Sequence, residues 1–83
     1  MPSSAQVSVN STPTLLAKTN GAPMEVHLHC AAGAVYLDSA GVTTSTGFKL
    51  DNGQSMTVTL TTNDELWAVA ATSSTLYTMT TIL

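Results

Sequence analysis

Apolar and polar residues alternate with a period of two along most of the chain. The clearest runs are residues 24–30 and 55–60, in which apolar positions alternate with Ser, Thr, Glu or His. Successive side chains of a β-strand point to opposite faces, so this pattern predicts strands with one buried face. Residues 66–71 are apolar at every position, as in a strand inside a sandwich. Since no stretch of ten residues repeats with the helical period, the sequence predicts an all-β protein.

Turn-forming residues separate these runs. Gly, Asn, Asp and Ser tolerate the backbone conformations of tight turns, and they cluster at 20–21, 39–41, 51–53, 62–64 and 72–74. Further strands are expected at 35–38 and 76–83, and residues 31–33 should form a hairpin between strands 24–30 and 35–38. The expected fold is a small antiparallel β-sandwich, or a jelly-roll-like barrel, of about six to eight short strands.

The N-terminal residues have a weaker pattern. Pro13 excludes residues 12–16 from the centre of a sheet because proline has no N–H for the ladder, so this segment should be an edge strand or an extended arm. Residues 1–10 are interpreted as an arm that is flexible or ordered only by a partner, and residues 11–83 as a single β-sandwich domain. Residues 1–20 are the candidate for docking on a larger assembly by adding to a neighbouring sheet edge.

Charged residues make up only 8% of the 83-residue chain, against about 25% in an average soluble domain. Thr and Ser together fill 24 positions, so hydroxyl groups provide most of the polar surface. With two lysines, no arginine and a net charge of −3, the chain lacks the cations that nucleic acid or an anionic membrane would require. It also shows no apolar run of about 20 residues and no signal-peptide pattern at its start. We therefore expect a soluble protein with neither nucleic acid nor a membrane as a partner.

A chain of this length builds a core that is marginal by itself. Cys30 is the single cysteine, so no internal disulfide reinforces the fold. The low charge gives weak repulsion between copies. We therefore expect the protein to work packed against neighbours, including copies of itself in a homo-oligomer.

His27 and His29 form the sharpest candidate site. On a strand they would point to the same side, about 6.5–7 Å apart, a spacing that suits two ligands of one zinc or nickel ion. Cys30 would point to the opposite face, and a closed site needs further ligands, such as Glu25 or residues of a second copy. A polar, solvent-facing strand is the simpler explanation, with Cys30 as a small buried hydrophobic residue. His27 and His29 are thus the metal-site candidates, but we assign no metal and no other cofactor.

The sequence contains no arrangement typical of catalysis. No serine lies in a Gly-x-Ser-x-Gly context, and His29 and Cys30, as strand neighbours, would face opposite ways. Asp64 and Glu65 are adjacent at a turn and are expected to be solvated. The dispersed glycines form no phosphate-binding loop. We therefore predict no catalytic residue and no enzymatic activity.

Tyr36, Trp67 and Tyr77 could stack on a sugar ring. This alternative function, a module that binds a glycan or a host-surface molecule, requires at least two of them on one exposed face. Because Trp67 lies in the apolar run 66–71, we expect it to be a core residue instead.

Four short motifs follow one another in the second half of the chain. They are Ala34-Val35-Tyr36-Leu37, Gly41-Val42-Thr43-Thr44-Ser45-Thr46-Gly47-Phe48-Lys49-Leu50, Asp51-Asn52-Gly53-Gln54-Ser55 and Asp64-Glu65-Leu66-Trp67-Ala68-Val69-Ala70-Ala71. Their combination resembles small virion proteins of tailed bacteriophages, of the β-sandwich decoration or cement type. Phe48 and Leu50 are then expected in the core or in a subunit interface, and the uncharged segment 42–46 should hydrogen-bond to another chain.

The resemblance implies a structural virion component that binds the outer capsid shell between major capsid subunits and reinforces it. Its implied partners are the major capsid protein and copies of itself. Its implied location is the capsid surface, after synthesis in the host cytoplasm. A neck, tail or head-fibre accessory protein and the glycan-binding module are the alternatives.

Overall fold

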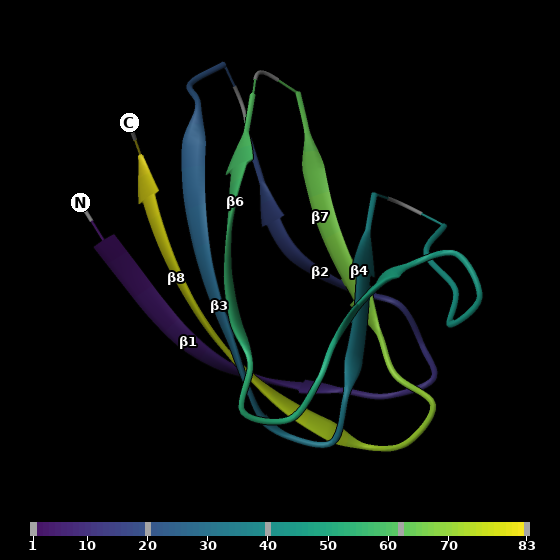
Figure 1. The fold of residues 1–83 in the computed structure, drawn as a ribbon. Coiled ribbons are helices and arrows are strands. Elements are labelled where there is room, and N and C mark those ends of the chain that lie inside the picture. The colour runs from purple at the N-terminus through teal and green to yellow at the C-terminus, as the bar shows by residue number, and fades with distance from the viewer. Residues whose placement is uncertain (1, 20, 40, 62, 83) are drawn as a thin grey trace.

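The computed structural model describes residues 2–19, 21–39, 41–61 and 63–82, and in these residues it contains eight strands and no helix (Figure 1). The strands form two antiparallel sheets of four, sheet A in the order β1-β8-β3-β6 and sheet B in the order β2-β7-β4-β5. The all-β class and the sandwich are therefore confirmed. Within the described residues, no helix has the length and apolar composition to cross a membrane. The strands are β1 (Pro2–Val9), β2 (Thr14–Lys18), β3 (Met24–Ala32), β4 (Val35–Asp38), β5 (Phe48–Leu50), β6 (Ser55–Leu60), β7 (Glu65–Val69) and β8 (Ser74–Ile82).

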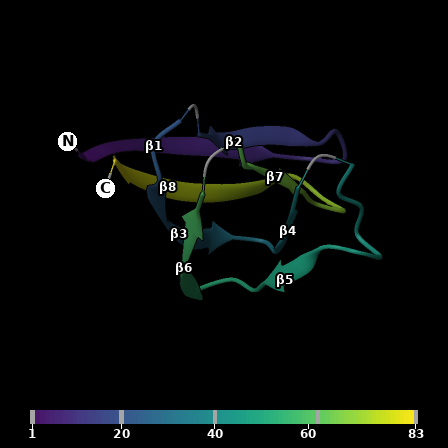
Figure 2. The same cartoon turned by 90° about the horizontal axis from the view of Figure 1, so that it is seen from above.

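The strand order is that of a jelly roll. The first strand pairs with the last, β2 with β7, β3 with β6, and β4 with β5, so the chain forms one long antiparallel ribbon. Two further pairs, β3 with β8 and β4 with β7, roll this ribbon into the two sheets. Seen from above, β1 and β2 lie along one side of the sandwich, and β5 and β6 lie along the other (Figure 2).

The period-two pattern places the apolar residues of both sheets in one core. In β3, for example, Val26, Leu28 and Cys30 are buried while His27 and His29 are exposed. The inner faces of the two sheets meet in the same way along the other strands. The buried core cluster comprises Val9, Ala17, Val26, Leu28, Cys30, Val35, Leu37, Leu50, Leu60, Leu66, Ala68, Ala70 and Leu76.

The connection between β3 and β4 is not the hairpin that its small residues suggested. It carries the chain from sheet A to sheet B, and β3 pairs with β6 and β8 instead. Gly33 has a φ of 75°, and a Cβ placed on it would lie 2.2 Å from Oγ of Ser74. Only glycine therefore fits this crossing without strain. A turn signal marks where the chain changes direction, but not which sheet the next strand joins.

The N-terminal segment is part of the sandwich rather than an arm outside it. Residues 2–9 form β1, which pairs with β8 from Pro2↔Thr81 to Val9↔Ser74. Val9 is fully buried, and Val7 packs against the core. Residues 2–9 therefore belong to the sandwich that the sequence predicted for residues 11–83. The sequence pattern missed this strand because its pairing partner lies at the other end of the chain. Pro13 directly precedes β2, which is an edge strand as expected.

Candidate interaction surfaces

The outer face of sheet A carries the two histidines. His27 and His29 point outward and are exposed, whereas Cys30 points inward and is fully buried, as the alternation of strand side chains predicts. Burial raises the pKa of the Cys30 thiol, which keeps it protonated and unreactive. The three side chains therefore lie on opposite faces of β3 and do not form one site.

Both imidazoles are held by neighbouring side chains. Nδ1 of His27 lies 3.0 Å from Oγ1 of Thr57, and its Nε2 lies 3.0 Å from Oε1 of Glu25. Nδ1 of His29 lies 2.9 Å from Oγ of Ser55. In the described part of the chain, no three His, Cys, Asp or Glu side chains are grouped to hold a metal ion. What this geometry provides is an ordered polar surface in which Glu25 is the partner of His27.

Two rows of side chains cross all four strands of this face. They line a shallow hollow of about 680 Å³. Tyr77 and Met79 are each 45% exposed in it, and the ring of Tyr77 stacks on that of His29 with centroids 6.4 Å apart. The rows hold no Asp, Glu, Lys or Arg, so the hollow suits contacts with uncharged groups. From β1 to β6 they are Gln6–Tyr77–His29–Ser55 and Ser4–Met79–His27–Thr57.

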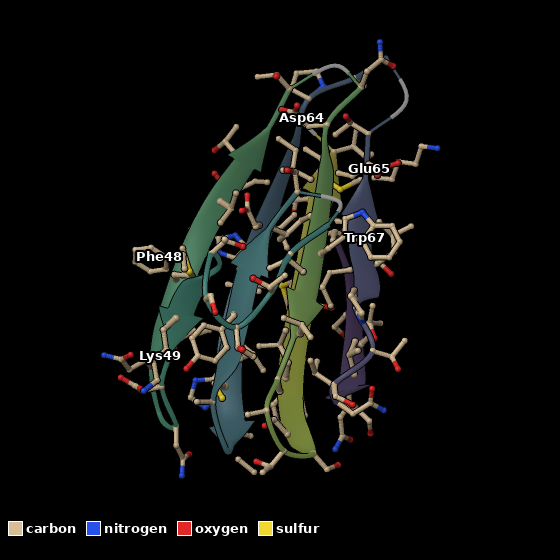
Figure 3. All side chains as sticks on the ribbon, turned by 90° about the vertical axis from the view of Figure 1, so that its right-hand side faces the viewer. Phe48, Lys49, Asp64, Glu65 and Trp67 are labelled. Atoms are coloured by element: carbon tan, nitrogen blue, oxygen red, sulfur yellow. The ribbon has the colours of Figure 1, made fainter. Side chains whose placement is uncertain are left out.

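Trp67 lies on the outer face of sheet B and not in the core. Leu66 and Ala68 on either side of it are buried inward, whereas Trp67 itself is only partly buried (Figure 3). Its indole N–H donates to Oε1 of Glu65 at 3.0 Å, and Oε2 of Glu65 lies 3.6 Å from Nζ of Lys18. The expectation of a core tryptophan is therefore wrong. The complete burial of Trp67 that would have excluded glycan stacking is not observed.

The run 66–71 is apolar on both faces because the loop 41–47 covers part of the outer face of sheet B. Val42 in this loop is buried, and a Cβ on Gly47 would lie 2.7 Å from Cβ of Tyr36 and 2.9 Å from Cγ2 of Val42. Tyr36 is paired with Val69, which is buried as well. The small residue at position 47 thus lets the loop pack directly on β4.

The hydroxyl groups of this loop bond to one another. The N–H of Gly47 donates to the carbonyl of Thr43 at 2.9 Å, and the hydroxyl oxygens of Thr43 and Thr46 are 2.9 Å apart. The N–H of Ser45 donates to Oγ1 of Thr43 at 3.3 Å. Two of the hydroxyls that were expected to bond another chain, those of Thr43 and Thr46, therefore stabilise the loop itself.

The two residues expected together in the core or an interface have different environments. Leu50 is buried in the core, whereas Phe48 is 66% exposed. Phe48 lies on β5, at the edge of sheet B (Figure 3). Phe48 is therefore available for a contact outside the sandwich, and Leu50 is not.

The few charged side chains are exposed or half-buried, and both lysines lie beside carboxylates. Nζ of Lys18 is 3.6 Å from Glu65, and Nζ of Lys49 is 3.3 Å from Asp51. Exposed pairs of this kind contribute about 0–1 kcal/mol each. Their main effect is to leave little positive potential anywhere on the described surface.

The free edges of the two sheets differ, a feature that the sequence analysis did not identify. In sheet B, β2 has an irregular register between Leu15 and Ala17 and ends in Lys18, and β5 has three residues with Lys49 at its centre. In sheet A, the edge strands β1 and β6 have eight and six residues and no charged side chain. The signal in the sequence is the absence of Lys, Arg, Asp and Glu from 2–9 and 55–60, but its meaning depends on knowing which strands are edges.

Comparison with known proteins adds a finding about the fold. No protein-family model and no curated protein matches the chain. A solved structure described as a Bacillus endospore appendage, from a family of disulfide-linked pili, is similar with a TM-score of 0.56 at 17% sequence identity. The match covers 100% of this chain and 88% of that one. At this identity the similarity shows a shared β-sandwich fold.

Proposed function

We propose that the protein is a structural subunit that works by packing against other protein chains, and that it decorates and reinforces the capsid of a tailed bacteriophage. The observation that carries the proposal is a surface with few charges, both lysines paired, and large apolar side chains exposed. Five such side chains are 43–66% exposed: Leu15, Phe48, Tyr77, Met79 and Ile82. Surfaces that remain in water normally carry many charges of both signs.

The fold and the sequence motifs support the capsid assignment. Jelly rolls are frequent in viral capsid proteins, where flat faces and edges serve as contacts. The motifs between residues 34 and 71 resemble those of phage decoration proteins, and they form β4, β5 and β7 of sheet B together with the loop 41–47 and the turn 51–54. The partners in this proposal are the major capsid protein and further copies of this chain.

Reinforcement would follow from mass action. A subunit that binds across the joint between two shell proteins stabilises the assembled state by the free energy of that binding. Low charge suits this role, because contacts made by hydroxyl and apolar groups are not weakened by screening. No catalytic group is needed, because the binding free energy of each copy adds to the stability of the joint that it spans.

A second candidate is a subunit of an extracellular filament, and the fold shared with the appendage protein favours it. That protein belongs to disulfide-linked pili, whereas Cys30 here is fully buried on the inner face of β3. A filament of this chain would therefore have to be held by non-covalent contacts.

Binding to capsids tests the proposal. Purified protein is mixed with phage particles that lack it, the particles are sedimented, and the temperature at which they release DNA is measured. We expect saturable binding at a fixed number of copies per particle and a higher release temperature. Absence of binding, with filaments seen by electron microscopy of the protein alone, would contradict decoration and support the second candidate.

A further inference from the structure

Sheet A ends in two edges that lack the features by which proteins prevent edge pairing. Charged side chains, register irregularities and short strands are the usual protection. Sheet B has all three, in Lys18, the Leu15/Ala17 irregularity and the three-residue β5. The edge strands β1 and β6 are longer, uncharged and regularly paired, and Pro2 at the first position of β1 is their only proline. Unpaired backbone groups along both strands are therefore open to another strand.

The directions of these two edges are complementary. β1 is antiparallel to β8, β8 to β3, and β3 to β6, so β1 and β6 run in opposite directions. They also lie on opposite sides of the sandwich (Figure 2). A second copy placed beside the first in the same orientation brings its β1 antiparallel to β6 of the first. Antiparallel pairing would satisfy the free backbone groups of both edges.

The side chains of the two edges match as well. On β6, Met56 and Val58 face the core and are only partly buried, while Ser55, Thr57 and Thr59 face outward. On β1, Val7 and Val9 face the core, and residues 4, 6 and 8 are outward-facing Ser or Gln. A joined sheet would continue the polar outer face across the contact, and Val7 and Val9 would continue its apolar inner face.

We infer that β6 of one copy pairs with β1 of another, so that sheet A continues from copy to copy. The contact joins two different edges, and every copy has one of each, so it repeats and generates a ring or a filament of subunits. The inference rests on the proposed function, because it names the contact through which copies of this structural subunit associate.

Cross-linking tests the strand pair directly. The rows across sheet A place Gln6 level with Ser55, so a second copy that continues the sheet in register brings its Gln6 beside Ser55 of the first. Gln6→Cys on β1 and Ser55→Cys on β6 each place a thiol on the outer face of an edge, and the native Cys30 is buried and serves as the unreactive background. The two variants are mixed and treated with a short bismaleimide, and dimers are measured by denaturing electrophoresis. We expect dimers from the mixture and from neither variant alone. Dimers from Ser55→Cys alone would show a two-fold β6–β6 contact, and no dimers at all would show that β6 and β1 do not pair in register; either result overturns the inference.

A matched pair of charge variants separates edge pairing from general apolar adhesion. Val58→Lys places a charge on the inner side of the β6 edge, whereas Phe48→Lys adds the same charge on β5 and removes a more exposed apolar side chain. Val58→Lys should weaken self-association by about tenfold or more, measured by light scattering after chromatography, because pairing would bury the ammonium group. A larger loss of self-association with Phe48→Lys than with Val58→Lys would overturn the inference. If Val58→Lys has no cooperative melting transition, the cross-linking result decides.

The failure of this inference can be told from failure of the proposed function. Protein that binds particles but gives no dimers between Gln6→Cys and Ser55→Cys retains the decoration role and disproves the edge contact. Protein that gives these dimers but does not bind particles keeps the edge contact and disproves decoration.

Discussion

Asp64 shows what a single exposed side chain contributes to this fold. The hydroxyl of Thr61 donates to its carboxylate at 2.8 Å and the N–H of Thr61 at 2.9 Å, which closes the turn between β6 and β7. The N–H of Asp64 donates to Oγ1 of the buried Thr19, and the N–H of Thr19 donates to the carbonyl of Asp64. Thr19 directly follows the edge strand β2, so these hydrogen bonds attach the end of β2 to the turn between β6 and β7.

The pH dependence of stability should report the Asp64 interaction. The hydroxyl and then the N–H of Thr61 lower the pKa of Asp64 below its ordinary value. A lowered pKa contributes stability above the unfolded pKa of about 4 and loses it as the pH falls through the folded value. Asp64→Asn should therefore lower the melting temperature slightly at pH 7, and the difference from the wild type should shrink steadily below pH 4.

Thr61→Val is the control for this prediction, because it keeps the carboxylate and removes its strongest donor. In thermal melts between pH 7 and pH 2, the melting temperature of Thr61→Val should therefore fall less than that of the wild type, because less stability is lost when its Asp64 carboxylate is protonated. Identical pH profiles for the wild type and both variants would show that the hydrogen bonds do not favour the charged carboxylate.

Single residues were predictable from the sequence when their role depended only on strand alternation. His27 and His29 face outward and Cys30 faces inward, as the period of two required. Trp67 could not be placed, because the apolar residues on its outward face are covered by a loop that returns from another part of the chain. The partners of the histidines, Ser55 and Thr57, belong to a different strand, so sequence spacing could not identify them either.

Among the strands, β1 is where the prediction and the structure differ most, and a substitution at its buried position gives the sharpest test. As an arm, the first residues would add little to stability. As a strand, β1 buries Val9 completely and pairs with β8 from Pro2↔Thr81 to Val9↔Ser74. Val9→Thr keeps the shape and buries a hydroxyl, and it should lower the free energy of unfolding by about 1–3 kcal/mol in urea titrations.

Ser8→Thr is the matched control, since Ser8 is exposed on the neighbouring position of the same strand. It should change the free energy of unfolding by less than about 0.5 kcal/mol. Equal and small effects of the two substitutions would mean that residues 2–9 do not belong to the folded core in solution.

Strand positions were better predicted than strand partners. Alternation marked β3, β6 and β8, and glycine and asparagine marked the turns between them, because both signals depend on residues close in the sequence. Pairing in a jelly roll joins segments from opposite ends of the chain, and β4 with β5 is its one pair of consecutive strands. The identity of the sheet edges, and with it the candidate contact surface, therefore required the structure.

The molecule as a whole is held together, and is proposed to bind its partners, almost entirely without charges. Its described surface has two lysine–carboxylate pairs and the Glu25–His27 pair, none of them buried. The strand ladders supply backbone hydrogen bonds, and the core is stabilised by removal of apolar area from water. Contacts with partners would remove the exposed apolar side chains from water in the same way. Salt that only screens charges and salt that strengthens apolar burial should consequently have different effects.

Raising sodium chloride from 0.05 M to 1 M shortens the screening length to about 3 Å. This change should leave both the melting temperature and the self-association of the protein nearly unchanged, because little of either depends on charge. Ammonium sulfate should raise both, since it favours burial of apolar surface. Lys49→Gln, which removes one exposed pair, should respond to the two salts as the wild type does. Dissociation in sodium chloride alone would show that a few charged groups, and not the uncharged faces and edges, hold the copies together.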